Sequence, residues 1–185
     1  MNQTITAVPG VEAGHFTHAS GTTGTTAIVF PSGAVAGGFV PGSAPGSREH
    51  GLLEPRHLAP VIHGVCLSGG SAFGLAAADG VMAALEARGV GLMVGAHLVP
   101  LVPAAILFDL PVAKARPDAS WGRRAADVAC RAPVQSGRVG AGAGARVAMA
   151  CGQPMPGGFG GAAGRVEDHT VGGALAVNSF GSVVD

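Results

Sequence analysis

The chain has 185 residues, of which 48% are hydrophobic and only 12% are charged, and its eleven Lys and Arg are balanced by eleven Asp and Glu. Nucleic-acid binding needs a concentrated positive field, and base stacking needs aromatic side chains, so seven Phe, one Trp and no Tyr argue against that class. Apolar runs are interrupted by Gly or Pro before they reach the length that spans a bilayer, so we expect no membrane partner.

The size of the chain favours a single domain portion over residues 1–185. A typical soluble domain has about 25% charged residues, so the low charge here predicts a face that other protein covers. No basic stretch followed by an apolar one opens the chain, as a secretory signal would. Cys66, Cys130 and Cys151 are widely spaced in apolar surroundings. We therefore expect buried, reduced thiols and a cytoplasmic protein.

The first third of the chain contains two predicted strands. Residues 8–11 form an extended piece and a turn, and residues 25–30 are β-branched, apolar and closed by a proline, which predicts a strand. Residues 35–40 are its predicted hairpin partner. A loop rich in Pro, Gly and Ser follows at residues 41–47, and residues 61–67 form the second apolar strand.

A helix is predicted over residues 72–88. Ser71 can cap its first turn, and apolar residues recur at near-helical spacing behind that position. Gly89 follows as a typical terminating residue. Because the helix is apolar on most of its sides, we expect it to be buried.

The second half of the chain mixes strands with one more helix. Residues 98–109 predict a short strand with an irregular entry, and a helix should run from Asp118 to about Arg131. The Gly/Ala-rich residues 137–150 predict an interior strand, and residues 171–184 predict the last strand. Because strands and helices do not alternate strictly, we expect an α+β layered sandwich rather than a doubly wound sheet.

The turn between the second strand and the first helix, Ser68-Gly69-Gly70-Ser71, has two interpretations. A Gly-rich turn that opens a helix presents backbone N–H groups and a positive dipole end, which suit an oxyanion or a phosphate. The same glycines also permit tight helix–strand packing. The motif lacks the Lys of a nucleotide-binding P-loop and the spacing of a dinucleotide loop.

Asn178 is a second candidate, since it follows the apolar run 174–177. A buried amide must be paired, and its N–H₂ could donate to the oxyanion of an acyl-transfer reaction. The alternative is a turn Asn at a strand end. We exclude self-cleavage between Asn178 and Ser179, because the second product would be too short to complete a site.

Metal and cofactor chemistry find no support in the residue pattern. The seven histidines form no pair at metal-binding spacing, and no Ser-His-Asp order or Gly-x-Ser-x-Gly elbow occurs. Asp79 and Asp109 lie in apolar context, where we expect structural roles. We therefore expect no metal and no cofactor, and no activated nucleophile within the chain.

Several segments, taken in order, carry a resemblance to a known family. They include the VPGV run at residues 8–11, residues 42–49 (GSAPGSRE) and residues 67–81 (LSGGSAFGLAAADGV). The match continues through Val102-Pro103-Ala104, Phe108-Asp109, Arg116-Pro117-Asp118, residues 137–142 (GRVGAG) and Ala176-Val177-Asn178. The chain therefore resembles the P1 (S58) peptidase family, which includes L-aminopeptidase/D-esterases, β-peptidyl aminopeptidases and nylon-oligomer hydrolases.

The resemblance implies a four-layer α/β/β/α sandwich and a precursor that cuts itself before a Ser or Thr. The freed residue would then be the nucleophile that transfers an acyl group to water. The cut in the family lies some tens of residues beyond the strand at 171–184. We therefore expect this chain to be most of the α part and inactive alone. Its expected partners are the β chain of the same precursor, small peptide or amide substrates, and further αβ units in a homo-oligomer.

The resemblance also implies roles for single residues. Asn178 matches the family's oxyanion Asn, and Ser68, Gly69, Gly70, Ser71 and Phe73 would form the pocket wall. Phe73 stands where nylon-oligomer hydrolases carry a Tyr, and Met149 where many relatives carry a Lys. Ile106 lies near the position at which β-peptidyl members carry a Glu that recognises a free amine, so the pattern favours a less amine-dependent amidase or esterase.

Three alternatives to this hydrolase remain open from the sequence. An acyltransferase would pass the acyl group to an amine instead of water. A diverged, non-catalytic subunit would serve assembly or small-molecule binding, and the substitutions at Phe73 and Met149 are what such a loss of chemistry would leave. A Gly-rich phosphate-binding module is the third.

Overall fold

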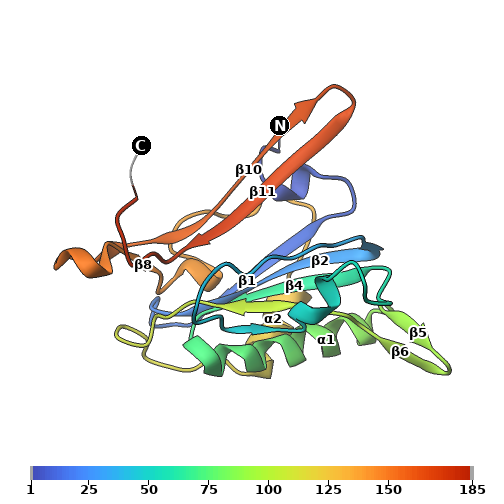
Figure 1. The fold of residues 1–185 in the computed structure, drawn as a ribbon, viewed down its shortest axis with the longest axis horizontal. Coiled ribbons are helices and arrows are strands. Elements are labelled where there is room, and N and C mark those ends of the chain that lie inside the picture. The colour runs from blue at the N-terminus through green and yellow to red at the C-terminus, as the bar shows by residue number, and fades with distance from the viewer. Residues whose placement is uncertain (1, 184–185) are drawn as a thin grey trace.

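The computed structural model describes residues 2–183, and its main feature is a five-stranded sheet in the order β1-β2-β4-β7-β3 (Figure 1). All neighbours are antiparallel except β4 and β7, which are parallel. The strands are β1 (Glu12–Thr17), β2 (Gly24–Ala34), β3 (Ser47–Arg48), β4 (Ile62–Ser68) and β7 (Ala104–Ile106). The predicted strands at residues 25–30 and 61–67 are thereby confirmed.

The hairpin partner predicted for β2 was wrong. β2 pairs with β1 on one side and β4 on the other, whereas residues 35–40 form no regular element. The register of β2 with β4 shifts between Val29 and Ala34, and Gly33 has a φ of +75°. This irregularity turns the chain away from the sheet, and Phe39 is left 85% exposed.

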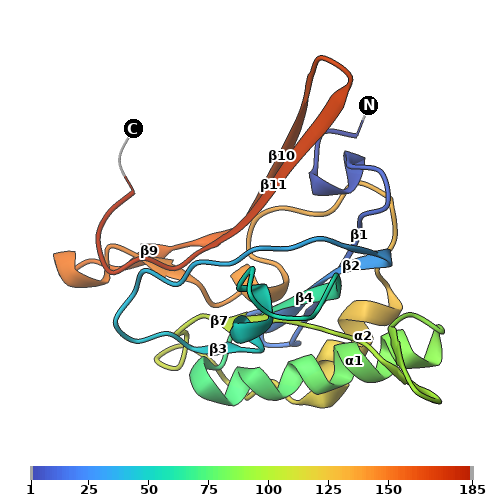
Figure 2. The same cartoon turned by 45° about the vertical axis from the view of Figure 1, so that its right-hand side comes forward.

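Two helices cover one face of this sheet, as Figures 1 and 2 show: α1 (Ala77–Ala87) and α2 (Ala119–Asp127). They approach closely because small residues meet there. A Cβ on Gly80 would overlap the carbonyl of Ala119, and a Cβ on Gly122 would overlap that of Ala77. Val81 and Leu85 of α1 and Ala125 of α2 are fully buried.

The boundaries of α1 differ from the prediction at its start and agree at its end. Residues 71–76 form a 3₁₀ helix, η3 (Ser71–Ala76), and the side chain of Ser71 caps nothing. Ser71 instead has a φ of +53°, whereas a residue that caps a helix with its side chain typically has an extended backbone. Gly89, with a φ of +71°, follows α1 as predicted. The helix is also less enclosed than expected, since Asp79 and Glu86 lie on an exposed side.

α2 begins where the sequence predicts. The carboxylate of Asp118 accepts the backbone N–H of Ser120 at 2.8 Å, so Asp118 is an N-cap. The helix ends at Asp127 rather than near Arg131.

On the other side of the sheet lies a hairpin of β10 (Gly158–Val166) and β11 (His169–Val177), with the short 3₁₀ helix η1 (Ile5–Ala7) against it (Figures 1 and 2). β11 confirms part of the strand predicted at 171–184, but it ends at Val177. Val184 lies outside the described residues.

Residues 137–150 are not the single strand that was predicted. They contain η4 (Gly140–Gly142), β8 (Arg146–Val147), which pairs with β9 (Met155–Pro156), and η5 (Met149–Cys151). Gly140 and Ala148 have φ values of +52° and +57°, which interrupt an extended chain. The interior position was predicted correctly, because residues 140–145 are buried.

The remaining elements are a small hairpin, β5 (Leu92–Val94) with β6 (His97–Val99), and the 3₁₀ helix η2 (His50–Leu53). Among residues 2–183, no helix has the length and apolar character to cross a bilayer. Cys66 is buried as predicted, and burial raises the pKa of its thiol to about 12 against the opposing charge of Arg48. Cys130 and Cys151 are exposed, so their predicted burial was wrong.

Candidate active site

The Ser68–Ser71 turn joins the end of β4 to the start of β2 and to the segment after β7. Gly69 donates its N–H to the carbonyl of Gly24 at 2.9 Å, and the hydroxyl of Ser68 bonds to that of Thr25 at 2.8 Å. Leu107 is bonded twice: its N–H reaches the Ser68 carbonyl at 2.8 Å, and its own carbonyl accepts the N–H of Ser71 at 3.0 Å. The turn is therefore held from both sides.

The third backbone N–H of the turn belongs to Gly70, and it donates to Oδ1 of Asp109 at 2.7 Å. The N–H groups of Gly69, Gly70 and Ser71 are thus all paired inside the chain. This arrangement favours the packing interpretation of the Gly-rich turn over the binding of a phosphate by its amides. Two consecutive residues of the turn have positive φ, Gly70 at +85° and Ser71 at +53°, and this conformation is strained for Ser71.

The glycines of the turn are required by space as well as by φ. A Cβ on Gly69 would overlap Oδ2 of Asp109 and lie 2.5 Å from Oγ1 of Thr23. A Cβ on Gly70 would overlap Cδ of Pro117, and one on Gly74 would overlap the carbonyl of Gly69.

Asp109 holds this turn through its hydrogen bond from the Gly70 N–H. It is 0% exposed, and within residues 2–183 its Oδ2 has no hydrogen-bond partner. Oγ1 of Thr23, also fully buried, is likewise without a partner in the described chain. A buried carboxylate that is bonded through one oxygen is costly to the folded state, and the one bond that the Asp109 carboxylate makes among the described residues is to the turn. The sequence offered one signal for it, an acid directly after an apolar run.

Phe73, two residues beyond the turn, is 49% exposed. The guanidinium carbon of Arg116 lies 3.9 Å from the centre of its ring, in a cation–π arrangement. The exposed ring and the cation above it stand beside the turn, because Pro117 packs on Gly70.

Asn178 directly follows β11 and is half-buried. Its Oδ1 accepts the backbone N–H of Arg146 at 2.9 Å. Since a backbone N–H can only donate, this bond fixes which end of the amide is the oxygen. The Nδ2 group therefore points elsewhere, and in residues 2–183 it has no acceptor.

The buried segment 140–145 and the half-buried Arg146 border both candidate regions. A Cβ on Gly144 would lie 2.7 Å from Oδ2 of Asp109, and Arg146, two residues on, bonds to Asn178. Leu67, just before the turn, and Ala176, just before Asn178, pack against the same small apolar cluster of Leu107, Ala141 and Ala145. The ends of β4 and β11 are thus held by one common core.

Two other residues singled out in the sequence, Met149 and Ile106, have uncharged side chains. Met149 lies in η5 and is half-buried. Ile106 packs closely against Gly46, because a Cβ on Gly46 would overlap its side chain. No group of three His, Cys, Asp or Glu residues within the described part of the chain is placed to hold a metal ion.

Two histidines have structural roles. Nδ1 of His63 accepts the N–H of Leu101 at 3.1 Å, and burial lowers the pKa of His63. His15 bonds through Nε2 to the Gln135 carbonyl at 3.1 Å and through Nδ1 to the Thr26 hydroxyl at 2.8 Å. Burial lowers its pKa, and the bond to Gln135 opposes that shift. Both rings are therefore favoured in the neutral form.

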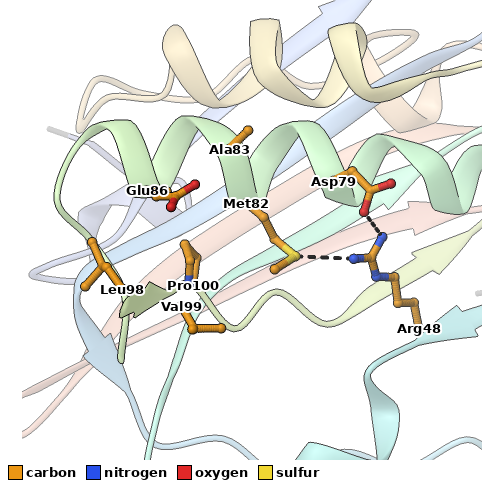
Figure 3. Close-up of a pocket in the computed structure, with 8 residues that line it drawn as sticks. All are labelled: Arg48, Asp79, Met82, Ala83, Glu86, Leu98, Val99 and Pro100. Carbon is orange, nitrogen blue, oxygen red and sulfur yellow. Dashed lines mark hydrogen bonds and ion pairs between the residues drawn. The ribbon is translucent and has the colours of Figure 1, made fainter. Parts of the chain in front are cut away.

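A separate hollow of about 270 Å³ lies between α1 and the segment around β6 (Figure 3). Arg48 lines this hollow and donates to Oδ1 of Asp79 at 2.5 Å and to Sδ of Met82 at 3.3 Å. The structural role expected for Asp79 is thus an ion pair with Arg48. This ion pair ties β3 to α1, and the hollow contains none of the predicted site residues.

Comparison with known proteins gives a consistent match. The model of peptidase family S58 matches residues 3–184. An uncharacterized aminopeptidase of Mycobacterium leprae is 39% identical over 199 residues, which cover 98% of this chain and 54% of that protein. A 6-aminohexanoate-oligomer endohydrolase of a Kocuria species is 32% identical over 136 residues, covering 72% of this chain and 36% of that protein. The match thus spans about half the length of the mycobacterial aminopeptidase and about a third of the endohydrolase.

Solved structures share the fold. A Burkholderia β-aminopeptidase superposes with a TM-score of 0.75 at 22% identity, over 98% of this chain and 53% of that one. The L-aminopeptidase D-Ala-esterase/amidase of Ochrobactrum anthropi, described as a variant of the Ntn hydrolase fold, gives 0.73 at 19% identity, over 95% and 53%. The α+β sandwich predicted from the sequence is confirmed.

Proposed function

Because this chain belongs to peptidase family S58, we propose that it is the α part of a self-cleaving amide hydrolase. The nucleophile is a Ser or Thr at the new N-terminus of a separate β chain. Its hydroxyl attacks the substrate carbonyl, the amine leaves with a proton, and water then hydrolyses the resulting ester. Residues 1–185 form one domain portion of that enzyme, and this part is inactive alone.

The observation that carries the proposal is the fixed orientation of Asn178. Its Oδ1 is held by the Arg146 N–H at 2.9 Å, which leaves the N–H₂ end as a preorganised donor. Such a donor stabilises the oxyanion that forms when a nucleophile adds to a carbonyl, and a single one contributes about 3 kcal/mol in known enzymes. Asn178 therefore has the role of oxyanion donor in this proposal.

The second element is the wall of the pocket, formed by residues 68–71 and Phe73. The internal bonds of the turn keep it in one conformation, so it positions the substrate through shape rather than through free amides. The exposed ring of Phe73 adds apolar surface beside it.

The names of the relatives support the substrate class. One is called an aminopeptidase and another a 6-aminohexanoate-oligomer endohydrolase, so both names denote the hydrolysis of amide bonds. We propose small peptides or amides as substrates, a cytoplasmic location, and a homo-oligomer of αβ units, without a cofactor.

Denaturing intact-mass measurement of the native protein, with N-terminal sequencing of every species, tests the proposal. The expected result is a second polypeptide that begins with Ser or Thr. A single species of 18.0 kDa, encoded by a gene with no longer precursor, would overturn it.

A diverged, non-catalytic subunit is the second candidate, favoured by the lack of a hydroxyl on Phe73 and of a charge on Met149. A serine-reactive probe separates the two, because the hydrolase forms a covalent adduct in the complete complex and the diverged subunit does not. If an adduct forms, product analysis with an added amine distinguishes acyl transfer to the amine from hydrolysis.

A further inference from the structure

We propose that Arg116 and Lys114 bind a substrate carboxylate beside Phe73, so that the enzyme prefers short peptides with a free C-terminal carboxylate over their amides. This inference rests on the proposed function and specifies its substrate class. The fold positions the Arg116 cation beside the pocket wall, over the ring of Phe73.

Arg116 is exposed, and its guanidinium carbon lies 3.9 Å from the centre of the Phe73 ring. Within residues 2–183, no carboxylate forms an ion pair with it. A guanidinium that covers a ring with its face keeps its N–H edges free. Those edges form the planar fork that binds a carboxylate through two parallel hydrogen bonds.

A hollow adjoins this cation. It has a volume of about 270 Å³ and is lined by Leu110, Ala113, Lys114, Ala115 and Arg116. Both cations of the loop line it, and no acid does. The acids that flank the loop in sequence are engaged elsewhere, since Asp109 is buried against Gly70 and Asp118 caps α2. The local field in the hollow is therefore positive, which favours an anionic group.

The backbone that carries the two cations is fixed. The carbonyl of Asp109 accepts the N–H groups of Val112 and Ala113, each at 2.9 Å, and the Lys114 N–H reaches Oγ1 of Thr22 at 3.2 Å. Pro117 is buried against Gly70. Binding then orders only side chains, which lowers the entropic cost of holding a ligand.

The same contacts place the hollow next to the pocket wall. Asp109 holds the turn through Gly70 and begins the loop, Pro117 closes the loop on that turn, and Phe73 lies under Arg116. A peptide whose scissile amide lies against the wall can extend its C-terminal carboxylate toward Arg116. A peptide amide has no charge to offer there.

The test compares a short peptide acid with its C-terminal amide on the complete protein. The wild type is expected to show a kcat/KM about tenfold higher for the acid, which corresponds to about 1.4 kcal/mol. Arg116→Gln should remove most of this ratio, mainly through a higher KM for the acid. Arg123→Gln is the matched control, because Arg123 is also an exposed Arg but lies on α2 beside Asp127.

Calorimetric binding of the same two peptides makes the result independent of turnover. Weaker binding of the acid by Arg116→Gln, with Arg123→Gln unchanged, supports the carboxylate site even if neither peptide is hydrolysed, and only the proposed function then fails. Equal binding of acid and amide by the wild type, or an acid preference that survives Arg116→Gln, overturns the inference.

Discussion

The carboxylate of Asp109 supports the backbone of Gly70 from 39 residues away, accepting its N–H at 2.7 Å while remaining fully buried. One carboxylate oxygen thus holds the turn of the candidate pocket wall, and the other has no partner in the described chain. This contact predicts that the stability of the fold depends more on an oxygen that accepts the Gly70 N–H than on the negative charge of Asp109.

Asp109→Ala should lower the free energy of unfolding by about 2–3 kcal/mol, because it leaves the Gly70 N–H buried and unpaired. Asp109→Asn should cost less, since its oxygen can accept the same N–H and its amide can donate toward Thr23. Urea denaturation of the native protein measures both. Asp118→Ala is the control for loss of an exposed carboxylate acceptor, with an expected cost of about 1 kcal/mol. Equal losses for Asp109→Ala and Asp109→Asn would show that the charge, not the bond, is required.

Gly69→Ala should destabilise the protein by about 1–3 kcal/mol, because the new Cβ would overlap Oδ2 of Asp109 and crowd Thr23. Gly173→Ala is the control, because Gly173 lies in β11 with nothing within 4 Å of its Cβ position. Thermal unfolding of the two variants side by side gives the comparison. A Gly69→Ala protein as stable as Gly173→Ala would mean that the turn can open without cost.

Local patterns predicted the parts of the fold that depend on local chemistry. The β-branched run at 25–30, the start of the second helix at Asp118 and the terminating Gly89 all appear where the sequence placed them. β10 was missed because its sequence, GFGGAAGRV, has weak strand propensity, and its conformation comes from pairing with β11.

The candidate site could be predicted only in part, for the same reason. Asn178 was singled out as a polar residue after an apolar run, but the N–H that orients it belongs to Arg146, 32 residues away. The role of Asp109 also depends on a distant contact. Such pairs depend on how strands and loops that are distant in sequence pack together. Local sequence patterns therefore do not predict them.

The stability of the protein should fall as the pH is lowered from about 7.5 to about 5. Burial lowers the pKa of His15 and of His63, so each binds its proton more readily in the unfolded chain, where the pKa is near 6.5. The stabilisation from the neutral rings is then complete above pH 6.5 and is lost as the pH falls through the lowered pKa values. Urea midpoints across this range measure the slope.

His63→Gln should flatten that slope, because Gln can still accept the Leu101 N–H but does not titrate. His97→Gln is the control, since His97 is exposed. If the two variants keep the same slope as the wild type, protonation of His63 does not contribute to acid destabilisation.

Asn178→Asp gives the sharpest test of the proposed oxyanion donor. The variant keeps an oxygen for the Arg146 N–H, so the fold should be retained, but it replaces the N–H₂ with a carboxylate oxygen. In the processed complex, kcat for a small amide should fall by about 10²–10³ or more, because the site loses a donor and gains a negative charge where the oxyanion forms. Asn178→Ala should lower kcat similarly and also destabilise the β8 region by leaving the Arg146 N–H without its acceptor. Ser179→Ala, which removes only a bond to the Gly181 carbonyl, is the control. An Asn178→Asp enzyme that turns over like the wild type would assign Asn178 to the strand end alone, as the turn residue that its position after Val177 also allows.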